Sequence, residues 1–361
     1  MVTAPFTYQT ESGEPAPTQL FEVDDSLGAD QALARVRRGE ALWYRGAFLN
    51  AKQLISAMSR RLAKPPVTAS ALDAFRQERR ARQLEHETLS KILVGLDRTY
   101  TLQLAKGPDV RSACENVWGA ATTDLTLTPL KTLLGMMGAE EWRKKGLTVP
   151  GLKGTLAPAF GVYTPTRAEY VELLTRVRDV EGKTVFDVGT GTGVLSFLLL
   201  QRGAAKVVAT DVEPRAVHCA KENAGRLRLG ARFAVVERPL FPDGRADLIV
   251  CNPPWIPEAP KNRFDRAVFD PDNAFLLGFL EGLAEHLTPG GRGLLIISDL
   301  AELLGLREAG WLEARIAAAG LVISNRSCAT PKHGKAKDKA DPLHAARSKE
   351  LTTLYELTPG R

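Results

Sequence analysis

Cysteine is scarce in this sequence of 361 residues, and no long apolar run is present. The four cysteines stand far apart, without the CxxC spacing of zinc or redox sites: Cys114, Cys219, Cys251 and Cys328. Neither a metal site nor a disulfide framework is therefore expected, and a reducing cytoplasm fits. The sequence also lacks the apolar run of roughly 18 residues that a membrane helix needs. We therefore expect a cytoplasmic protein without a membrane partner.

Lysine and arginine are missing from the first 30 residues, where proline, glycine, threonine and acids mix. Without a basic start and an apolar core region, this segment does not resemble a secretory signal. Its composition predicts a flexible leader over residues 1–29.

Basic residues concentrate in two later stretches. Residues 31–65 contain eight Lys or Arg against the single acid Glu40, and residues 331–349 form a second, lysine-rich stretch. The net charge is only +6. This balance permits a polyanionic partner such as a nucleic acid but does not require one.

Two regions with different periodicity follow the leader. Residues 30–147 show the apolar spacing of helices, including one long pattern over 71–97, and predict a mostly helical domain for substrate recognition. Residues 148–361 alternate helical stretches with short apolar runs: 184–188, 206–211, 233–237, 247–252, 293–298, 321–325 and 352–357. Such alternation predicts an α/β fold with a mainly parallel sheet covered on both faces.

The first of these runs continues into a glycine-rich turn, VFDVGTGTGVLSF. Gly189, Gly191 and Gly193 let the backbone approach a ligand closely, because they lack side chains. A dinucleotide-binding turn needs a small residue at the position of Val194, so a nicotinamide cofactor is disfavoured. A structural glycine turn in another α/β enzyme is the remaining alternative.

Two acids accompany this turn. Asp211 ends the next apolar run, where a carboxylate suits the two hydroxyls of a ribose. A plain surface position is the alternative for Asp211. Asp187 directly precedes the glycines, and it either contacts a cofactor or only orders the loop.

A second motif, VCNPPWIPE, follows the fourth apolar run. In an open α/β sheet this run neighbours the first one, and ligands bind beyond the carboxyl ends of both. Asn252, Pro253, Pro254 and Trp255 would then project beside the glycine loop. The alternative is that the two prolines only end a strand and that Trp255 is a core aromatic. Cys251 is expected to be a small buried strand residue.

Together these motifs resemble the class I S-adenosylmethionine-dependent methyltransferases. The GxGxG turn with its preceding acid is similar to their motif I. The Asn-Pro-Pro-Trp sequence is similar to motif IV of the amino-methyltransferases, which act on planar amine or amide nitrogens. The segment FGVYTPTRAEYVELL (160–174) resembles one that runs over the cofactor in the release-factor glutamine methyltransferases and the ribosomal-RNA guanine-N2 methyltransferases. The resemblance covers about residues 158–300 and implies a Rossmann-like seven-stranded sheet with S-adenosylmethionine as cofactor.

The resemblance also assigns roles to particular residues. It implies cofactor contacts at the following positions: Asp187, Gly189, Thr190, Gly191, Gly193, Asp211, Val212 and Asn252. It implies that Asn252, Pro253, Pro254 and Trp255 are catalytic, and that Tyr163, Thr164 and Trp255 contact the substrate. An ordinary helix start capped by Thr164 is the alternative for the preceding segment.

Two departures separate the chain from the glutamine methyltransferases. The last motif position is Trp255, where those enzymes typically have tyrosine. Arg238 or Pro239 stands where they usually have the acid that recognises adenine. We therefore expect backbone or apolar contacts near Leu240 and Phe241 to recognise adenine instead.

The residue types of the second motif suit methyl transfer to an amino nitrogen. An NH₂ group conjugated to a ring or a carbonyl is a poor nucleophile, because its lone pair is delocalised. The side-chain carbonyl of Asn252 and the backbone carbonyl of Pro253 can accept its two N–H bonds and aim the lone pair at a methyl group. The indole of Trp255 offers a flat face for stacking. Neither a metal nor a covalent nucleophile is needed.

The last two apolar runs are joined by residues 326–351, which include the lysine-rich stretch. In the class I fold this connection leaves from the edge that carries the active site, and it is far longer than a usual hairpin loop. We therefore predict a basic insertion without clear structure, in which Lys332, Lys335 and Lys337 grip nucleic-acid phosphates. A solvated basic loop is the alternative.

Three acceptors are consistent with these features. The leading hypothesis is the amino nitrogen of a nucleic-acid base, preferably RNA, because of Trp255 and the two basic stretches. The second is the side-chain amide of a protein glutamine or asparagine, implied by the resemblance of residues 160–174. The third is a small amine or amide. A binding module without catalysis is disfavoured by the intact Asn-Pro-Pro-Trp motif, and the oligomeric state is left open.

Overall fold

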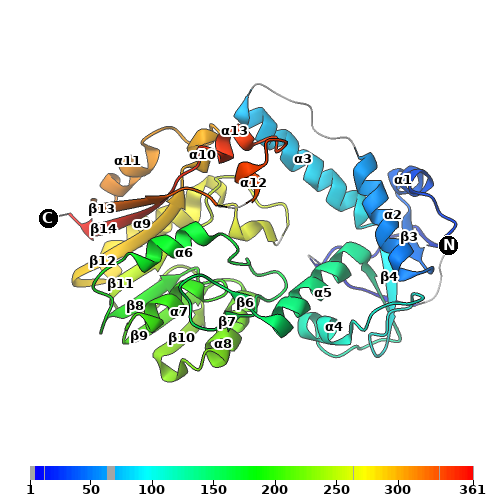
Figure 1. The fold of residues 1–361 in the computed structure, drawn as a ribbon, viewed down its shortest axis with the longest axis horizontal. Helices are drawn as coiled ribbons and strands as arrows, with labels where there is room; N and C mark the ends of the chain where they lie inside the picture. Colours follow the sequence, from blue (N-terminus) through cyan, green and yellow to red (C-terminus); the bar gives the residue numbers. More distant parts are fainter. Residues whose placement is uncertain (1–4, 12, 63–69, 263, 333, 361) are drawn as a thin grey trace. The chain divides into compact units, whose positions relative to one another are not determined.

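The computed structural model describes residues 5–11, 13–62, 70–262, 264–332 and 334–360. The chain divides into two compact units (Figure 1), one of Met1–Pro66 with Arg76–Glu141 and one of Val67–Phe75 with Trp142–Arg361. Each unit is built on a sheet of its own. The predicted change of architecture at residues 147–148 lies close to the division between them.

The first unit contains a five-stranded sheet in the order β1-β5-β4-β3-β2. Its strands are β1 (Thr7–Tyr8), β2 (Leu20–Val23), β3 (Ala41–Tyr44), β4 (Ile92–Asp97) and β5 (Leu125–Pro129). Neighbouring strands pair in parallel, except that β4 and β5 are antiparallel. Its helices are α1 (Ala29–Arg37), α2 (Phe48–Arg61) and α4 (Arg111–Trp118), together with most of α3 (Ala71–Leu89) and α5 (Leu130–Lys145).

The helical character predicted for residues 30–147 is confirmed, but the prediction missed this sheet. The helix expected over residues 71–97 ends at Leu89, and Ile92–Asp97 forms the central strand β4 instead. The first five residues of β4 are buried, so apolar side chains face both sides of the sheet without alternation. A short unbroken apolar run cannot be told from a buried helix segment by its period.

The flexible leader predicted for residues 1–29 is a further correction, because this segment supplies the strands β1 and β2 and the start of α1. Leu20 is only 2% exposed and belongs to a core cluster with Trp43, Leu93 and Leu127. The segment is mostly polar, so its composition does not indicate that a few apolar residues such as Leu20 are buried in the core.

The second unit contains the predicted seven-stranded sheet, in the order β10-β9-β8-β11-β12-β14-β13. Its strands are β8 (Thr184–Val188), β9 (Lys206–Asp211), β10 (Phe233–Glu237), β11 (Ala246–Cys251), β12 (Leu287–Ser298), β13 (Leu321–Ala329) and β14 (Thr352–Pro359). All neighbours pair in parallel except β14, which is antiparallel to both β12 and β13. A separate two-stranded sheet joins β6 (Leu147–Thr148) to β7 (Thr155–Leu156).

Helices cover both faces of the seven-stranded sheet. Val185 and Val250 belong to a core cluster with α6 (Ala168–Thr175) and α7 (Val194–Gln201), whereas Phe186 belongs to a second cluster with α9 (Ala274–His286) and α11 (Trp311–Ala318). The helix α8 (Pro214–Arg226) packs on β9 and β10. Within the described residues, no helix is both long and apolar enough to span a membrane.

The connection between β13 and β14 has more structure than predicted. Its first residues, 326–329, belong to β13, and it contains the short helices α12 (Gly334–Lys337) and α13 (His344–Arg347). Leu343 and Ala346 are buried in a cluster with Phe75, Ile256 and Leu304, the last of which follows α10 (Leu300–Leu303). The prediction of an irregular loop over residues 326–351 is therefore wrong, since two buried side chains anchor the connection to the sheet domain.

We expect Leu343→Ala to release this connection from the domain. Removal of a buried leucine side chain costs about 2–5 kcal/mol. Limited trypsin digestion should therefore cut the connection faster in this variant, and the denaturation midpoint should fall. Lys339→Arg, an exposed change in the same connection that keeps the trypsin site, is the matched control. Equal digestion rates for the two variants would contradict the anchoring.

Candidate active site

The glycine loop between β8 and α7 forms one wall of a cavity of about 750 Å³ in the second unit. Gly189, Gly191 and Gly193 have φ angles of +77°, +55° and +87°, which favour glycine. A Cβ atom on Gly193 would clash with the ring of Phe197, whereas one on Gly191 would meet no atom within 4 Å. Gly191 lines the cavity, so its missing side chain leaves that space for a ligand.

Asp187 lies beneath this loop, fully buried, and does not line the cavity. Its Oδ2 accepts hydrogen bonds from Thr190 Oγ1 at 2.7 Å and from Ser196 Oγ at 2.6 Å. Burial raises the pKa of the Asp187 carboxyl to about 6, although these hydrogen bonds oppose the shift. Of the two interpretations left open by the sequence, the geometry favours the one in which Asp187 orders the loop.

Asp211 ends β9 and does line the cavity, together with Thr190 and Val212. Its Oδ2 accepts a hydrogen bond from the Gly191 amide at 2.9 Å, and its Oδ1 accepts one from the Glu213 amide at 3.0 Å. Burial raises the pKa of the Asp211 carboxyl above its usual value, while these backbone bonds act against the rise. Each carboxylate oxygen retains capacity to accept a further bond from a hydroxyl.

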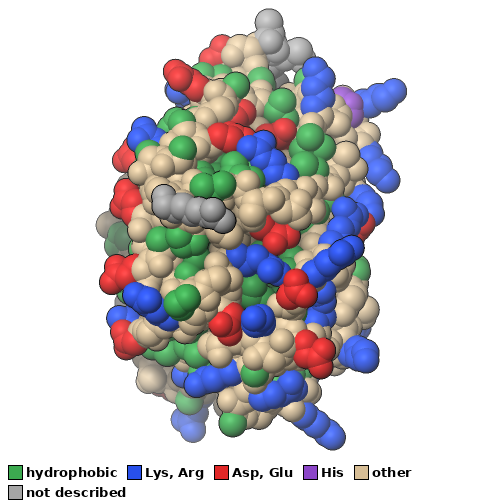
Figure 2. Space-filling view, turned by 90° about the vertical axis from the view of Figure 1, so that its left-hand side faces the viewer, with side chains coloured by type: hydrophobic (Ala, Val, Ile, Leu, Met, Phe, Trp, Pro, Cys, Tyr) green, Lys and Arg blue, Asp and Glu red, His purple; other side chains and the backbone are tan. Residues whose placement is uncertain are grey.

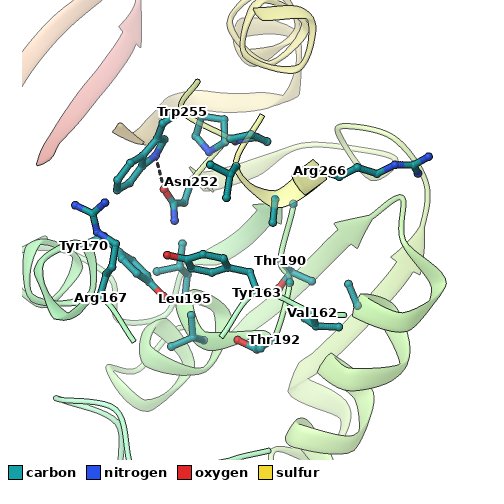
Figure 3. Close-up of a pocket in the computed structure, with 18 of the residues that line it drawn as sticks. Val162, Tyr163, Arg167, Tyr170, Thr190, Thr192, Leu195, Asn252, Trp255 and Arg266 are labelled. Atoms are coloured by element: carbon teal, nitrogen blue, oxygen red, sulfur yellow. Dashed lines mark hydrogen bonds between the residues drawn. The ribbon is translucent and has the colours of Figure 1, made fainter. Parts of the chain in front are cut away.

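The Asn-Pro-Pro-Trp motif follows β11, which pairs in parallel with β8. All four residues, Asn252, Pro253, Pro254 and Trp255, line the same cavity as the glycine loop. The indole Nε1–H of Trp255 donates a hydrogen bond to Asn252 Oδ1 at 3.0 Å (Figure 3). The predicted meeting of the two motifs at one edge of the sheet is therefore present in the structure.

Arg167 is a cavity residue that the sequence prediction missed. Its guanidinium lies over the Trp255 ring, 4.6 Å from the centroid (Figure 3). It also forms ion pairs with Glu169, which is fully buried, and with Glu350, whose oxygen lies 2.8 Å away. The signal available in the sequence was an arginine within the segment 160–174 that was expected to cover the cofactor.

Among the predicted substrate contacts, the structure places only Tyr163 and Trp255 on the cavity. Thr164 does not line it, although the neighbouring Thr166 does. Lys332 instead forms an ion pair with Glu172 at 2.8 Å.

The connection between β13 and β14 reaches the cavity through residues other than the predicted lysines. Lys337 is exposed and does not line the cavity, and the side chain of Lys335 lies outside the described residues. The wall instead includes Gly334, Arg347 and Glu350.

The expected adenine contacts near Leu240 and Phe241 are not at the cavity either. Phe241 is buried and stacks on the rings of Phe279 and His286. The sequence suggested that this apolar side chain contacts a ligand, but it packs in the core beneath α9 instead.

Cys251 is fully buried at the end of β11, as the sequence predicted. Burial raises the pKa of its thiol well above the usual value, which keeps it protonated and weakly nucleophilic. Among the described residues, no three His, Cys, Asp or Glu side chains are grouped so that they could hold a metal ion.

Comparison with known proteins points to the same chemistry. The family model of the ribosomal protein L11 methyltransferases (PrmA) matches residues 158–253. A release factor glutamine methyltransferase of Deinococcus radiodurans is 32% identical over 278 residues, which cover 72% of this chain and 91% of that protein. The chain belongs to the release factor glutamine methyltransferase family of class I S-adenosylmethionine-dependent methyltransferases.

Two further relatives are similar in sequence to this methyltransferase. A protein of Methanocaldococcus jannaschii, named for protein N5-glutamine methylation, is 33% identical over 162 residues, which cover 43% of this chain and 80% of that protein. A ribosomal protein L11 methyltransferase of Pelotomaculum thermopropionicum is 35% identical over 147 residues, 40% of each chain. The methyltransferase is thus an enzyme that transfers a methyl group from S-adenosylmethionine to nitrogen.

The cavity of the methyltransferase fits this cofactor. The open space above Gly191 admits a ligand against the loop backbone, and Asp211 presents carboxylate oxygens at the end of β9. A volume of about 750 Å³ lies within the usual range of small-molecule sites. The remaining wall, which includes Asn252, borders the same space.

Asp211→Ala should weaken binding of S-adenosylmethionine by about 10- to 100-fold, because hydrogen bonds from the ribose to a charged acceptor are lost. Isothermal titration calorimetry measures this change. Glu237→Ala is the matched control, since Glu237 pairs in register with Asp211 on β10 but is exposed and does not line the cavity. Unchanged affinity in Asp211→Ala would remove Asp211 from the cofactor site.

Asp187→Asn should change how stability depends on pH. The folded pKa of about 6 exceeds the unfolded value of ~3.9, so the folded protein holds an extra proton between these values. The unfolding free energy of the unsubstituted methyltransferase should therefore fall by roughly 3 kcal/mol as pH rises through this window. Asp187→Asn should lack that fall, as measured by denaturant unfolding from pH 4 to pH 7, whereas Glu237→Gln should retain it. Parallel curves for Asp187→Asn would contradict the raised pKa.

Proposed function

We propose that the acceptor is the side-chain amide nitrogen of a glutamine in a protein. The observation that carries the proposal is the placement of Asn252 and Pro253 on the wall of a cavity that also holds the glycine loop. Two of the relatives are named for methylation of glutamine, which makes this amide the acceptor class that agrees with both sequence and site.

The charge on the cavity wall supports a neutral acceptor. Among the described residues that line the cavity there is no lysine, and all three arginines have carboxylate partners. Arg167 pairs with Glu169 and Glu350, Arg266 pairs with Glu213, and Arg347 pairs with Asp341. A phosphate entering this space would compete with these partners, whereas an uncharged amide would not.

The Trp255 ring also argues against a nucleic-acid base as acceptor. One face of the indole is covered by Arg167, and the ring packs against the core beneath α9. Figure 2, which views the molecule from the side of the C-terminus, shows Lys and Arg side chains mixed with Asp and Glu over that face only. Of the three features behind the RNA hypothesis, the Trp255 ring and the second basic stretch thus receive no support from the described cavity wall.

The chain's own residues can make the amide nitrogen reactive. An amide NH₂ has two N–H donors, which the Asn252 side-chain oxygen and the Pro253 carbonyl can accept. The Pro253 carbonyl belongs to a stiff proline pair and Asn252 directly precedes that pair, so the two acceptors can hold the nitrogen with its lone pair toward the cofactor. When bound, S-adenosylmethionine supplies the methyl group as an electrophile on its sulfonium.

Charge development strengthens these contacts during transfer. The nitrogen would gain positive character as its lone pair forms the new N–C bond while the bond from the methyl group to the sulfonium breaks and leaves a neutral thioether. The two carbonyl dipoles stabilise the charge on nitrogen more than they stabilised the neutral amide. The nitrogen then loses one proton to water, which restores a neutral N-methyl amide. This scheme requires no ionisable base, which agrees with the buried, protonated thiol of Cys251 nearby.

The proposal is tested by supplying S-adenosylmethionine with a labelled methyl group and a total cell extract. We expect label that stays with protein after dialysis, is released by protease and survives nuclease. Acid hydrolysis of the labelled protein should free labelled methylamine, because an N-methyl amide yields methylamine and glutamate. Label that survives hydrolysis as a methylated amino acid, or that nuclease releases, would contradict a glutamine acceptor.

Asn252→Ala should lower the rate of this transfer by about 100-fold or more, because one preorganised acceptor is lost from the transition state. Affinity for S-adenosylmethionine should change much less, since the glycine loop and Asp211 are untouched. Glu237→Ala again serves as the control with unaltered turnover. Full activity of Asn252→Ala would show that the amide is oriented by other groups.

A further inference from the structure

The hydrogen bond from Trp255 to Asn252 fixes the orientation of the Asn252 side-chain amide, with its oxygen toward the indole. An indole Nε1–H is only a donor, whereas an asparagine side chain has an oxygen at one end and an NH₂ group at the other. With Oδ1 3.0 Å from Nε1, the bond is made. If the Asn252 amide were rotated by half a turn, two donors would face each other and the bond would be lost.

The oxygen held in this way keeps room for an acceptor molecule. A carbonyl oxygen has two lone pairs, and the indole uses one of them. Asn252 and Trp255 both line the cavity, so the oxygen that the indole holds belongs to a residue of the cavity wall, and its second lone pair is not used by the indole. A rotated amide would offer NH₂ to the acceptor's N–H groups and would repel them.

Trp255 is itself held from its other side. The guanidinium of Arg167 covers the indole at 4.6 Å, and Arg167 is anchored by ion pairs with Glu169 and Glu350. Glu350 is 1% exposed and accepts a hydrogen bond from Ser298 Oγ at 2.6 Å. The orientation of the indole therefore depends on residues from α6, the end of β12 and the connection that precedes β14.

We infer that Trp255 and Arg167 are positioning residues: Trp255 selects the orientation of the Asn252 amide in which its oxygen faces the acceptor, and Arg167 holds Trp255 in place for this task. The inference rests on the proposed transfer to an amide nitrogen. It assigns to Trp255 a role that phenylalanine cannot fill, because the phenylalanine ring carries no hydrogen-bond donor.

The decisive experiment combines Trp255→Phe with Asn252→Asp. Trp255→Phe keeps an aromatic face but removes the donor, and it should lower kcat about 3- to 10-fold with little change in KM or cofactor affinity, as expected for the loss of one hydrogen bond. In the Asn252→Asp background the same change should lower kcat less than about twofold, because a carboxylate presents an oxygen in either orientation. Equal losses in both backgrounds would overturn the inference, as would no loss with Asn252.

A second measurement needs no acceptor and separates this inference from the proposed function. In nitrogen-15 NMR spectra, the indole N–H of Trp255, assigned by its absence in Trp255→Phe, should be protected from exchange with solvent. Asn252→Ala should shift this signal and speed its exchange. An unaltered signal would show that the bond to Asn252 does not form, even if protein methylation proceeds. This NMR measurement also tests the inference if the Asn252→Asp variant turns over too slowly for its kcat to be measured.

The part played by Arg167 has its own test. Arg167→Lys keeps the charge but loses the planar group that stacks on the indole and bridges two carboxylates. We expect faster exchange of the Trp255 indole N–H and a lower kcat in this variant. Arg326→Lys is the matched control, because Arg326 stacks on Tyr355 at 5.2 Å and pairs with Glu313 away from the cavity. Unchanged exchange in Arg167→Lys would remove Arg167 from the inference.

Discussion

The parallel pairing of β8 with β11 is the constraint on which the active site depends. Parallel strands end at the same edge, so the glycine loop after Val188 and the Asn-Pro-Pro-Trp motif after Cys251 emerge side by side. Paired residues of the two strands, such as Val185 and Leu248, are 63 positions apart in sequence, and no local interaction could bring the motifs together. Burial of β8 and β11 on both faces makes this register costly to change, because a shift by one residue exchanges the side chains of the two cores.

Two carboxylates fix the conformation of the glycine loop at the cofactor site. Asp187 binds Thr190 and Ser196 from below, and Asp211 binds the amide of Gly191 from the side. The loop therefore holds its shape through hydrogen bonds within the protein itself. A site that is already ordered loses less conformational entropy when its ligand binds.

The sequence predicts the part of the structure that local patterns encode. All seven strands of the large sheet in the second unit were predicted, because buried parallel strands form unbroken apolar runs between helices, whereas the two-residue strands β6 and β7 were not. The sheet of the first unit was missed, since its strands are short and β4 follows α3 without a turn signal. Arg167 and Glu350 were missed for a different reason: their roles arise from a contact between segments 183 residues apart, which no spacing rule reveals.

The contrast between local patterns and contacts of distant segments also applies to function. The residues proposed for the chemistry form a local motif, whereas the residues that would select the acceptor come together only in the folded chain. On the proposed function, methyl transfer to an amide nitrogen needs carbonyl acceptors on a rigid backbone, and Asn252 and Pro253 would supply them within the four-residue motif. Such a motif can be recognised in the sequence, because the prolines that make it rigid are part of the motif itself. The charge that an acceptor meets depends instead on which arginines are paired with carboxylates, and those pairs form only after folding. A lysine-rich stretch in the sequence therefore says little about the acceptor, because Lys332 pairs with Glu172 and the described wall of the cavity is left without a lysine.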